Sequence, residues 1–491
     1  MDYKPTQSPP IIPRLIIHGG AGNILPSNLS PEKYKLYHDS LLRILAESHY
    51  FLTSKSCFPL SNSNNAHKSD KSDKSDTSSN TSTKTVSALD AVTFAVSLLE
   101  DNPLFNSGHG AVFTRDGVNE LEASIMVSKG MKKRGVGVMG IQHVKNPIKL
   151  AREMLIRGEQ DLVGGNGRAV SGGAQGHSQL HQYSAEKLAR EWGLECVEPS
   201  YYFTQGRWDE HIRGLEKEKA GGVATWDEEH FFPQGTCGAV ALDGEGVLAV
   251  ATSTGGMTNK LTGRIGDTPT LGAGFWAEEW EEEFSSKSRV ESMLSQSGPA
   301  LIMSDTLTGL IADCLPNPMA YSPLPKQDID PEYLSKGDRV FRSSAMSGTG
   351  NGDSFLRINA CRTASAIARY RGAKSNQKTS LQDAVTEIAG PGGELVKSAG
   401  ERWQKTGEGE GGIIGIELTL VIGANGEKKV VDSQIVDDFN CGGMFRAAVD
   451  PDNGKAVMRA WKPGQHEGIE RYEGEGREYD LRDWFDEKVL G

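Results

Sequence analysis

The sequence predicts an α+β protein in which helices cover sheets built largely of antiparallel strands. Two pairs of short apolar runs are separated by hairpin turn residues: Asp-Gly-Glu-Gly joins 236–242 to 247–253, and a segment containing Asn-Gly joins 413–422 to 428–435. Helical patterns lie between the strands without the regular alternation of a parallel sheet. These observations favour antiparallel sheets with helical layers over a βαβ fold.

The helix that begins after residue 86 is the best defined of the other elements. Ser87 and Asp90 have the spacing of a capping box, and the apolar residues that follow share one helical face until the chain reaches Pro103. A buried amphipathic helix is therefore expected here. Further strands are expected at 15–18 and 135–141, and further helices at 147–157, 185–192 and 354–371.

Composition and charge describe a soluble folded protein. The chain has 491 residues, a net charge of −12 and a pI near 5.5, which argues against nucleic acid or an anionic membrane as a partner. The first apolar run is short and is broken by Pro13, unlike a signal peptide or a membrane span, so we expect a cytoplasmic protein. The six cysteines include no Cys-x-x-Cys pair, so neither a zinc site nor a disulfide framework is predicted.

Three segments have the composition of insertions or linkers. Residues 61–84 contain no large apolar side chain and are expected to be a disordered insertion. Residues 164–235 are rich in glycine and charge and are expected to form a flexible linker, and 278–342 are acidic and then proline-rich, as in a second insertion.

The dipeptide Gly235-Thr236 stands where the linker ends and a small-residue strand begins. A threonine hydroxyl is a weak nucleophile, but cleavage of the bond before Thr236 would free an α-amine on the same residue to act as its base. Such an amine has a reference pKa of about 7.7 to 8.0, so it is partly neutral at cellular pH. Gly235 allows the backbone strain that self-cleavage requires. The dipeptide by itself also fits an ordinary turn that enters a strand.

The surrounding residues decide between these two interpretations. The stretch "GTCGAVALDGEGVLAVATSTGGMTNKLTGRIGDTPTLGAGFWA" (235–277) resembles the plant-type asparaginase family, which includes isoaspartyl aminopeptidases, glycosylasparaginases and threonine aspartases. The resemblance recurs in "IIHGGAG", "LEDNPLFNSGHGAVFTRDG", "LEASIM", "SGTGNGD" and "FNCGGMFRA". It implies a four-layer αββα sandwich of the N-terminal-nucleophile hydrolase type. Cleavage would divide one domain into an α part, 1–235, and a β part, 236–491, and we expect the αβ units to form dimers.

The resemblance also implies catalytic roles for five residues. Thr236 matches the nucleophile, and Thr254 matches a second threonine whose hydroxyl bonds at the nucleophile. Thr349 and Gly350 match the pair that stabilises the oxyanion, by a hydroxyl and a backbone N–H. Asn106 matches an asparagine of the active site. Taken alone, Thr254 fits an ordinary strand end, and the glycine-rich loop around Thr349 lacks the Lys-Ser/Thr of a phosphate-binding loop.

Arg264 and Asp267 are the expected substrate-binding pair. A guanidinium can hold a carboxylate with two hydrogen bonds, and a carboxylate can hold an ammonium, so together they suit the α-carboxylate and α-amine of an amino acid. By resemblance this is their role; without it, a surface salt bridge between them is the alternative.

A structural sodium ion is implied by the same resemblance, and no other cofactor is expected. Carbonyl oxygens suffice for a hard monovalent cation. The matching carbonyls are those of Leu99, Glu100, Asn102, Phe105, Ser107 and His109. His18 is expected to be a structural hydrogen-bonding histidine, and Cys237 a small buried thiol in place of the usual valine or isoleucine.

These residues predict an autoprocessed threonine hydrolase that acts on L-asparagine or on β-aspartyl peptides, through a β-aspartyl ester on Thr236. A threonine-aspartase endopeptidase and a glycosylasparaginase are the enzymatic alternatives. An unprocessed scaffold that binds partners through its insertions is the non-enzymatic one.

Overall fold

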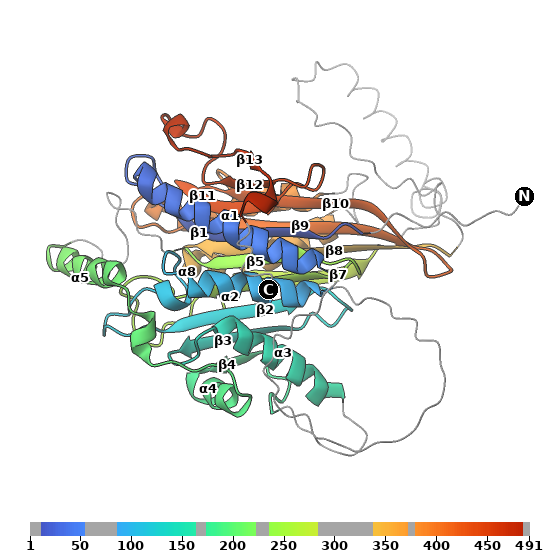
Figure 1. Cartoon of the computed structure of the whole chain (residues 1–491), viewed down its shortest axis with the longest axis horizontal. Coiled ribbons are helices and arrows are strands. Elements are labelled where there is room, and N and C mark those ends of the chain that lie inside the picture. Colours follow the sequence, from blue (N-terminus) through green and yellow to red (C-terminus); the bar gives the residue numbers. More distant parts are fainter. Residues whose placement is uncertain are drawn as a thin grey trace, which may run out of the picture.

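Two β-sheets face each other, and helices lie on their outer sides (Figure 1). The computed structural model describes residues 11–54, 86–163, 173–221, 235–282, 337–371 and 379–484. The strands are β1 (Arg14–Gly22), β2 (Leu121–Val127), β3 (Gly135–Ile141), β4 (Gln179–His181), β5 (Cys237–Leu242), β6 (Leu248–Thr254), β7 (Phe275–Glu281), β8 (Arg339–Gly350), β9 (Gly411–Ile422), β10 (Lys428–Phe439), β11 (Gly443–Val449), β12 (Ala456–Arg459) and β13 (Glu478–Tyr479).

The α-helices that cover the sheets differ in length. They are α1 (Pro31–Thr53), α2 (Ala88–Asp101), α3 (Pro147–Val163), α4 (Gln182–Glu191), α5 (Gln205–Lys219), α8 (Gly352–Ile358), α9 (Ala360–Ala366), α10 (Leu381–Ala389) and α11 (Glu394–Ala399). Short 3₁₀ turns η1 (Gly108–Gly110), η2 (Pro199–Tyr202), η5 (Gly400–Arg402), η6 (Ile469–Arg471) and η7 (Leu481–Trp484), and a π turn η4 (Ile367–Arg371), complete the elements. None of the described helices is long and apolar enough to cross a membrane.

Antiparallel pairing dominates both sheets, as expected for an α+β protein. The larger sheet has the strand order β13-β12-β11-β1-β5-β6-β2-β3-β4, and only its β3–β4 pair is parallel. The smaller sheet has the order β10-β9-β8-β7 and is antiparallel throughout. The two predicted hairpins are confirmed as β5–β6 and β9–β10.

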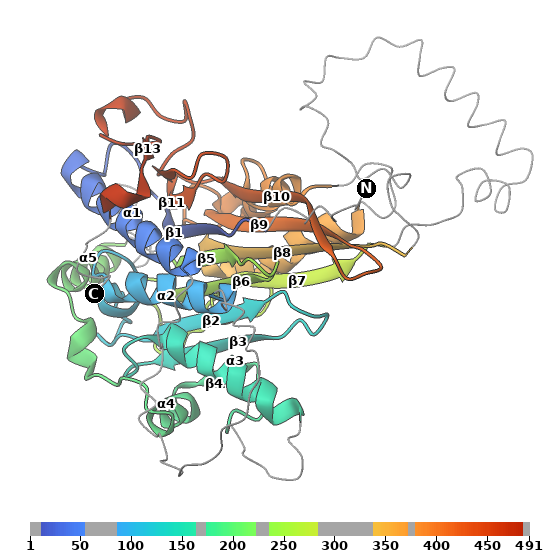
Figure 2. The same cartoon turned by 45° about the vertical axis from the view of Figure 1, so that its right-hand side comes forward.

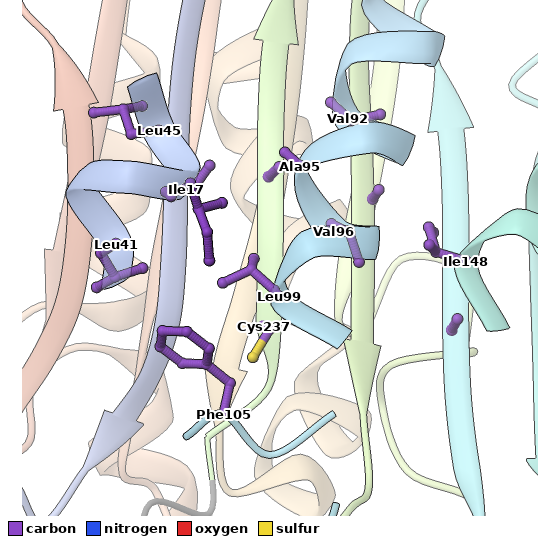
Figure 3. Close-up of a cluster of buried hydrophobic side chains, with 14 of the residues drawn as sticks. Ile17, Leu41, Leu45, Val92, Ala95, Val96, Leu99, Phe105, Ile148 and Cys237 are labelled. Atoms are coloured by element: carbon purple, nitrogen blue, oxygen red, sulfur yellow. The ribbon is translucent and has the colours of Figure 1, made fainter. Parts of the chain in front are cut away.

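Alternating side chains divide the core into two clusters. On β5, Cys237, Ala239 and Ala241 face α1 and α2, where they join the cluster that includes Leu99 and Phe105 (Figure 3). The intervening Val240 and Leu242 belong to the other cluster, which includes residues of the smaller sheet and its helices α9 and α10. Successive strand residues point to opposite faces, so the even-numbered residues of β5 face the second sheet.

Two helix predictions had different outcomes. The helix after residue 86 is confirmed as α2, and the Ser87 hydroxyl accepts a hydrogen bond from the Asp90 amide at 3.2 Å. The single helix expected at 354–371 is wrong. Asn359 adopts a left-handed conformation, with φ of +50°, and divides the segment into α8 and α9, because a residue with positive φ cannot continue a right-handed helix.

The three predicted insertions differ in what the structure describes. Residues 61–84 lie outside the described residues. The expected linker, 164–235, holds folded elements in its described part, namely β4, α4, η2 and α5. The expected insertion at 278–342 begins and ends inside paired strands, since Glu281 of β7 pairs with Phe341 of β8, and its interior lies outside the described residues.

Candidate active site

The predicted nucleophile lies between the two sheets. Thr236 immediately precedes β5 and is 4% exposed. Side chains alternate between the two faces of a strand, so Thr236 lies on the same face as Val240, which points toward the second sheet. Cys237 pairs with Ser253 at the end of the β5–β6 ladder, so Thr236 and Thr254 are the next residues on the two strands. The structure thus brings the two predicted threonines to the same end of neighbouring strands.

The peptide before Thr236 packs against the backbone of the His-Gly-Gly-Ala-Gly segment. A Cβ on Gly235 would lie 2.3 Å from the Gly20 Cα and 2.4 Å from the Ala21 nitrogen, so only glycine fits. That Ala21 nitrogen donates a hydrogen bond to Thr349 Oγ1 at 3.2 Å. Ala21 therefore contacts both the Thr349 hydroxyl, which is predicted to stabilise the oxyanion, and Gly235, whose carbonyl precedes Thr236.

Gly350 must also be a glycine in this fold. Its φ is +141°, and a Cβ on it would lie 2.3 Å from the Glu410 carbonyl oxygen. The chain therefore turns sharply at the end of β8, directly after Thr349. This turn leads at once into α8, whose first turn lies next to the predicted substrate-binding pair.

Asn106 fixes the loop after α2 to the loop after β6. Its amide nitrogen donates to the Gly256 carbonyl at 2.8 Å, its amide oxygen accepts from the Val112 amide at 3.1 Å, and its own carbonyl accepts from the Gly255 amide at 3.0 Å. The Gly256 amide in turn donates to Thr254 Oγ1 at 3.0 Å. Asn106 is therefore a buried link between the second threonine and the loop that contains the predicted cation carbonyls.

Arg264 and Asp267 converge on the first residue of α8. A Cβ on Gly352 would lie 2.5 Å from Asp267 Oδ1 and 2.9 Å from Arg264 Nη2. Arg264 also forms an ion pair with Asp353, 3.1 Å from Nη2 to Oδ1, and Asp353 is 57% exposed. Because exposed ion pairs contribute little, a substrate carboxylate can replace Asp353. The structure pairs Arg264 with Asp353, so the alternative of a salt bridge between Arg264 and Asp267 is not found in the described part of the chain.

Burial makes Asp267 an unusual carboxyl group. Removal from water raises its pKa to about 7, and Glu122 adds to the rise, while Arg264 opposes it. Oδ2 of Asp267 has no hydrogen-bond partner among the described residues. A buried acceptor of this kind suits an ammonium group.

Two residues that sequence reasoning missed complete this surface. Thr268 Oγ1 lies 3.3 Å from Thr236 Oγ1, so the Thr268 hydroxyl contacts the predicted nucleophile, whereas the Thr254 hydroxyl accepts from the Gly256 amide. Glu122 pairs with Thr254 in the β2–β6 ladder, is 1% exposed, and accepts from the Gly266 amide at 2.8 Å. Both had signals in the sequence: Thr268 follows Asp267 directly, and Glu122 is the acidic residue within the buried strand LEASIM.

His18 is placed as a structural residue, as expected. Its Nε2 lies 2.7 Å from Ser347 Oγ, which joins β1 of one sheet to β8 of the other. Burial lowers the pKa of His18 to about 3, against a smaller opposite effect from the Thr236 backbone. The ring is therefore neutral at cellular pH and cannot serve as a cationic group there.

Cys237 faces away from the site that Thr236 faces. Its sulfur lies among Leu99, Phe105 and the helices of the larger sheet (Figure 3). Burial raises the pKa of the thiol to about 12. Since the thiolate is the reactive form, burial disfavours reaction of this cysteine, and its position fits the prediction of a small buried thiol.

Comparison with known proteins fits this geometry. The model of the asparaginase family matches residues 65–171 and 173–297. The isoaspartyl peptidase of Escherichia coli is 36% identical over 267 residues, which are 54% of this chain and 67% of that protein. The chain belongs to the asparaginase family. The isoaspartyl peptidase/L-asparaginase of Rattus norvegicus is 30% identical over 57% of this chain and 67% of its own length. A plant-type L-asparaginase of Pyrococcus abyssi is 40% identical over 40% of this chain and 59% of its own length.

In this asparaginase-family chain, carbonyl oxygens from the end of α2 and the turn after it lie close to Gly108 and Gly110. A Cβ on Gly108 would lie 2.2 Å from the Glu100 oxygen, and one on Gly110 would lie 2.2 Å from the Phe105 oxygen. Four of the predicted carbonyls also accept backbone hydrogen bonds, namely Leu99, Asn102, Phe105 and Ser107. A carbonyl oxygen has two lone pairs, so these four retain the capacity to bind. This neutral oxygen set fits a hard monovalent cation.

Proposed function

We propose that this asparaginase-family chain is an N-terminal-threonine hydrolase that releases ammonia from L-asparagine and cleaves β-aspartyl peptides. The observation that carries the proposal is the position of Thr236. It immediately precedes β5 with its hydroxyl 3.3 Å from that of Thr268, and the residue just before Thr268 is Asp267, part of the proposed substrate-binding pair. The relatives named as isoaspartyl peptidases and L-asparaginases support the same activity.

Maturation would be the first reaction at this site. Thr236 Oγ attacks the Gly235 carbonyl carbon, the C–N bond breaks, and the Thr236 nitrogen gains the proton. Water then hydrolyses the resulting ester. This leaves a carboxylate on Gly235 and a free amine on Thr236, so that residues 1–235 form an α part and 236–491 a β part.

Catalysis would use the new amine as base. The amine accepts the hydroxyl proton while Oγ attacks the side-chain carbonyl of the substrate, and the Thr349 hydroxyl and the Gly350 N–H stabilise the oxyanion. The proton passes from the amine to the departing nitrogen, which leaves as ammonia or as the amine of a peptide. Water, deprotonated by the same amine, then hydrolyses the β-aspartyl ester on Thr236. Thr254 and Asn106 hold the neighbouring loop in place.

Substrate selection would follow from Arg264 and Asp267. The guanidinium binds the free α-carboxylate with two hydrogen bonds, and the buried carboxylate of Asp267 binds the α-ammonium. An α-linked aspartyl peptide has no free α-carboxylate at that position and would leave Arg264 without its partner. The group beyond the side-chain carbonyl is not fixed by this pair, so an amide and a β-linked peptide are both accepted.

Three further features belong to the same proposal. We infer a four-layer αββα sandwich, because α1, α2 and α3 pack on the larger sheet, α9 and α10 pack on the smaller one, and the sheets contact each other (Figure 2). We also propose sodium as the cation of the 99–109 loop, where it would stabilise the loop without taking part in the reaction. Dimerisation of αβ units is proposed from the family alone.

A gel and four substrates test the proposed function. The purified protein should separate on a denaturing gel into two bands of roughly 25 and 28 kDa, with threonine as a new N-terminus. The processed protein is then incubated separately with L-asparagine, β-Asp-Leu, α-Asp-Leu and a glycosylated asparagine, and released ammonia or amine is measured. Hydrolysis of the first two alone is expected. Cleavage of only the α-linked peptide would favour the endopeptidase, cleavage of only the glycosylated substrate would favour the glycosylasparaginase, and a single inactive band would favour the scaffold.

A further inference from the structure

Helix α5 lies upstream of Thr236 and at the end of the sheets opposite the β9–β10 hairpin (Figure 1 and Figure 2). The residues that it buries are Arg207, His211 and Gly214. Their spacing places them on one helical face. This buried face is polar, whereas an ordinary surface helix buries aliphatic side chains against the core. The helix is therefore docked through specific polar contacts.

Arg207 binds the loop that carries Asn106, here called the first loop (residues 102–113). Its Nε donates to the Gly110 carbonyl at 2.8 Å, and its Nη2 donates to the Leu104 carbonyl at 3.3 Å. The side chain is 5% exposed. These two carbonyls are not among the six proposed for the cation. Arg207 and a cation would therefore stabilise the same loop through different oxygens.

His211 binds the loop between Thr254 and Arg264, here called the second loop (residues 255–263). His211 Nδ1 donates to Asn259 Oδ1 at 2.5 Å, and Asn259 Nδ2 donates back to the His211 carbonyl at 3.1 Å. Asn259 has a φ of +58°, a left-handed conformation that is uncommon for non-glycine residues and that asparagine tolerates better than most. The two-point contact with α5 restrains this residue.

Aromatic packing joins α5 to both loops. The rings of Phe113, in the first loop, and Trp208 are 5.2 Å apart and nearly perpendicular, and the rings of Trp208 and His211 are 4.9 Å apart. The Asn259 amide also donates to the Phe113 carbonyl at 2.8 Å. The two loops and the helix thus meet at Phe113.

We propose that α5 is a clamp that holds both active-site loops, with Arg207 and His211 as positioning residues. The inference rests on the proposed function, because the loops are the ones that place Asn106 near the nucleophile and lead to Arg264. It gives the segment before the cleavage site a role that continues after cleavage. The α part is then required for activity in the mature enzyme.

The clamp predicts a different kinetic defect for each contact. Arg207→Ala releases the loop of Asn106, so kcat of the processed enzyme for L-asparagine should fall about tenfold while KM changes little. His211→Ala releases the loop that leads to Arg264, so KM should rise about tenfold while kcat changes little. His211→Asn keeps a short donor and should restore most of the affinity. Ile212→Ala, at a residue that is 39% exposed on the same helix, is the matched control and should behave as wild type.

Amide hydrogen exchange provides a readout independent of activity. Exchange should increase in the first loop (102–113) of Arg207→Ala and in the second loop (255–263) of His211→Ala, and in neither loop of Ile212→Ala. If both loops exchange at the wild-type rate in Arg207→Ala and in His211→Ala, the clamp proposal is wrong, even if a variant is poorly processed. Folded, processed variants with kcat and KM both within twofold of wild type would overturn it as well. If the wild type itself neither cleaves nor hydrolyses L-asparagine, the proposed function fails, and the exchange experiment still decides the clamp.

Discussion

The two faces of β5 differ sharply where the strand begins, between Thr236, which precedes it, and Cys237, its first residue. Thr236 and Cys237 are neighbours in the chain, and both are buried. The threonine faces the second sheet, where hydroxyl groups, a guanidinium and a buried carboxyl gather. The cysteine faces the helices, among Leu99 and Phe105.

Under the proposed mechanism, this difference means that surroundings, rather than intrinsic chemistry, decide which of the two residues reacts. A thiol is the better nucleophile when ionised, but the apolar face raises the pKa of Cys237 to about 12 and suppresses its thiolate. The weaker hydroxyl of Thr236 lies 3.3 Å from the Thr268 hydroxyl on the polar face, and in the proposed mechanism the freed amine of the same residue accepts its proton. The predictions below test this contrast, from the largest expected effect to the smallest.

Replacement of Thr236 by alanine should have the largest effect on self-cleavage and on hydrolysis. Thr236→Ala should abolish self-cleavage and lower hydrolysis of L-asparagine by at least about 10⁴-fold, because both nucleophile and base are lost. Thr236→Ser should retain part of each reaction. Cleavage is followed on a denaturing gel and hydrolysis by released ammonia. Substantial ammonia release by Thr236→Ala would remove this residue from the mechanism.

Arg264 tests the polar face at the substrate. Arg264→Lys keeps the charge but loses the two-bond fork, so KM for L-asparagine should rise by about 10- to 100-fold with a smaller change in kcat. Asp353→Asn is the matched control: it removes the exposed ion-pair partner of Arg264 and should leave KM equal to or slightly below that of wild type. An unchanged KM in Arg264→Lys would mean that the carboxylate is bound elsewhere.

The buried carboxyl of Asp267 predicts a pH dependence of substrate affinity. Its pKa is raised to about 7, chiefly by burial; Arg264 opposes the rise, and Glu122 and, to a smaller extent, Asp353 add to it. Below that pH the group is protonated and cannot attract an ammonium, so KM should increase about tenfold as the pH falls from 8 to 6. In Asp267→Asn, KM should be high and nearly independent of pH in this interval. A flat KM in the wild type would contradict the prediction.

The apolar face should give the smallest effect on activity. Cys237→Ala should hydrolyse L-asparagine within about twofold of wild type and lose about 1 kcal/mol of unfolding free energy, because a small buried side chain is shortened. Alkylation of the folded wild type should modify the exposed Cys196 much faster than Cys237, as read by mass spectrometry of peptides. Rapid modification of Cys237, or strong inactivation of Cys237→Ala, would break the contrast between the two faces.

The sequence was most informative where local chemistry decides the structure. The α2 cap and the two hairpins depend on residues close in the chain, and the glycines at 235 and 350 sit in motifs that can be recognised directly. The sequence of β8 is rich in small polar residues and does not predict a strand. This segment is a strand because β7 and β9 pair with it on both sides, and such pairing depends on residues far apart in the chain.

Two helices show other limits of the sequence. Helix α1 has a clear start at Ser30 and Pro31, but tyrosines and a histidine occupy several of its buried positions and weaken the apolar pattern. Helix α5 buries a polar face, so it has no apolar stripe, and its partners Gly110 and Asn259 lie about 50 to 100 residues from it. The expectation of a linker from 164 to 235 failed to include α5 for this reason.

The burial of Gly235 and Thr236 determines how the intact chain can mature. Gly235 is packed against Gly20, and Thr236 is 4% exposed, so the bond between them lies where a second protein cannot bind it in extended form. The proposed self-cleavage should then be a unimolecular event with a first-order time course. We expect its half-life to be set by the folded chain itself, so that dilution, added protease inhibitors or the choice of expression host leave it unchanged once the fold has formed.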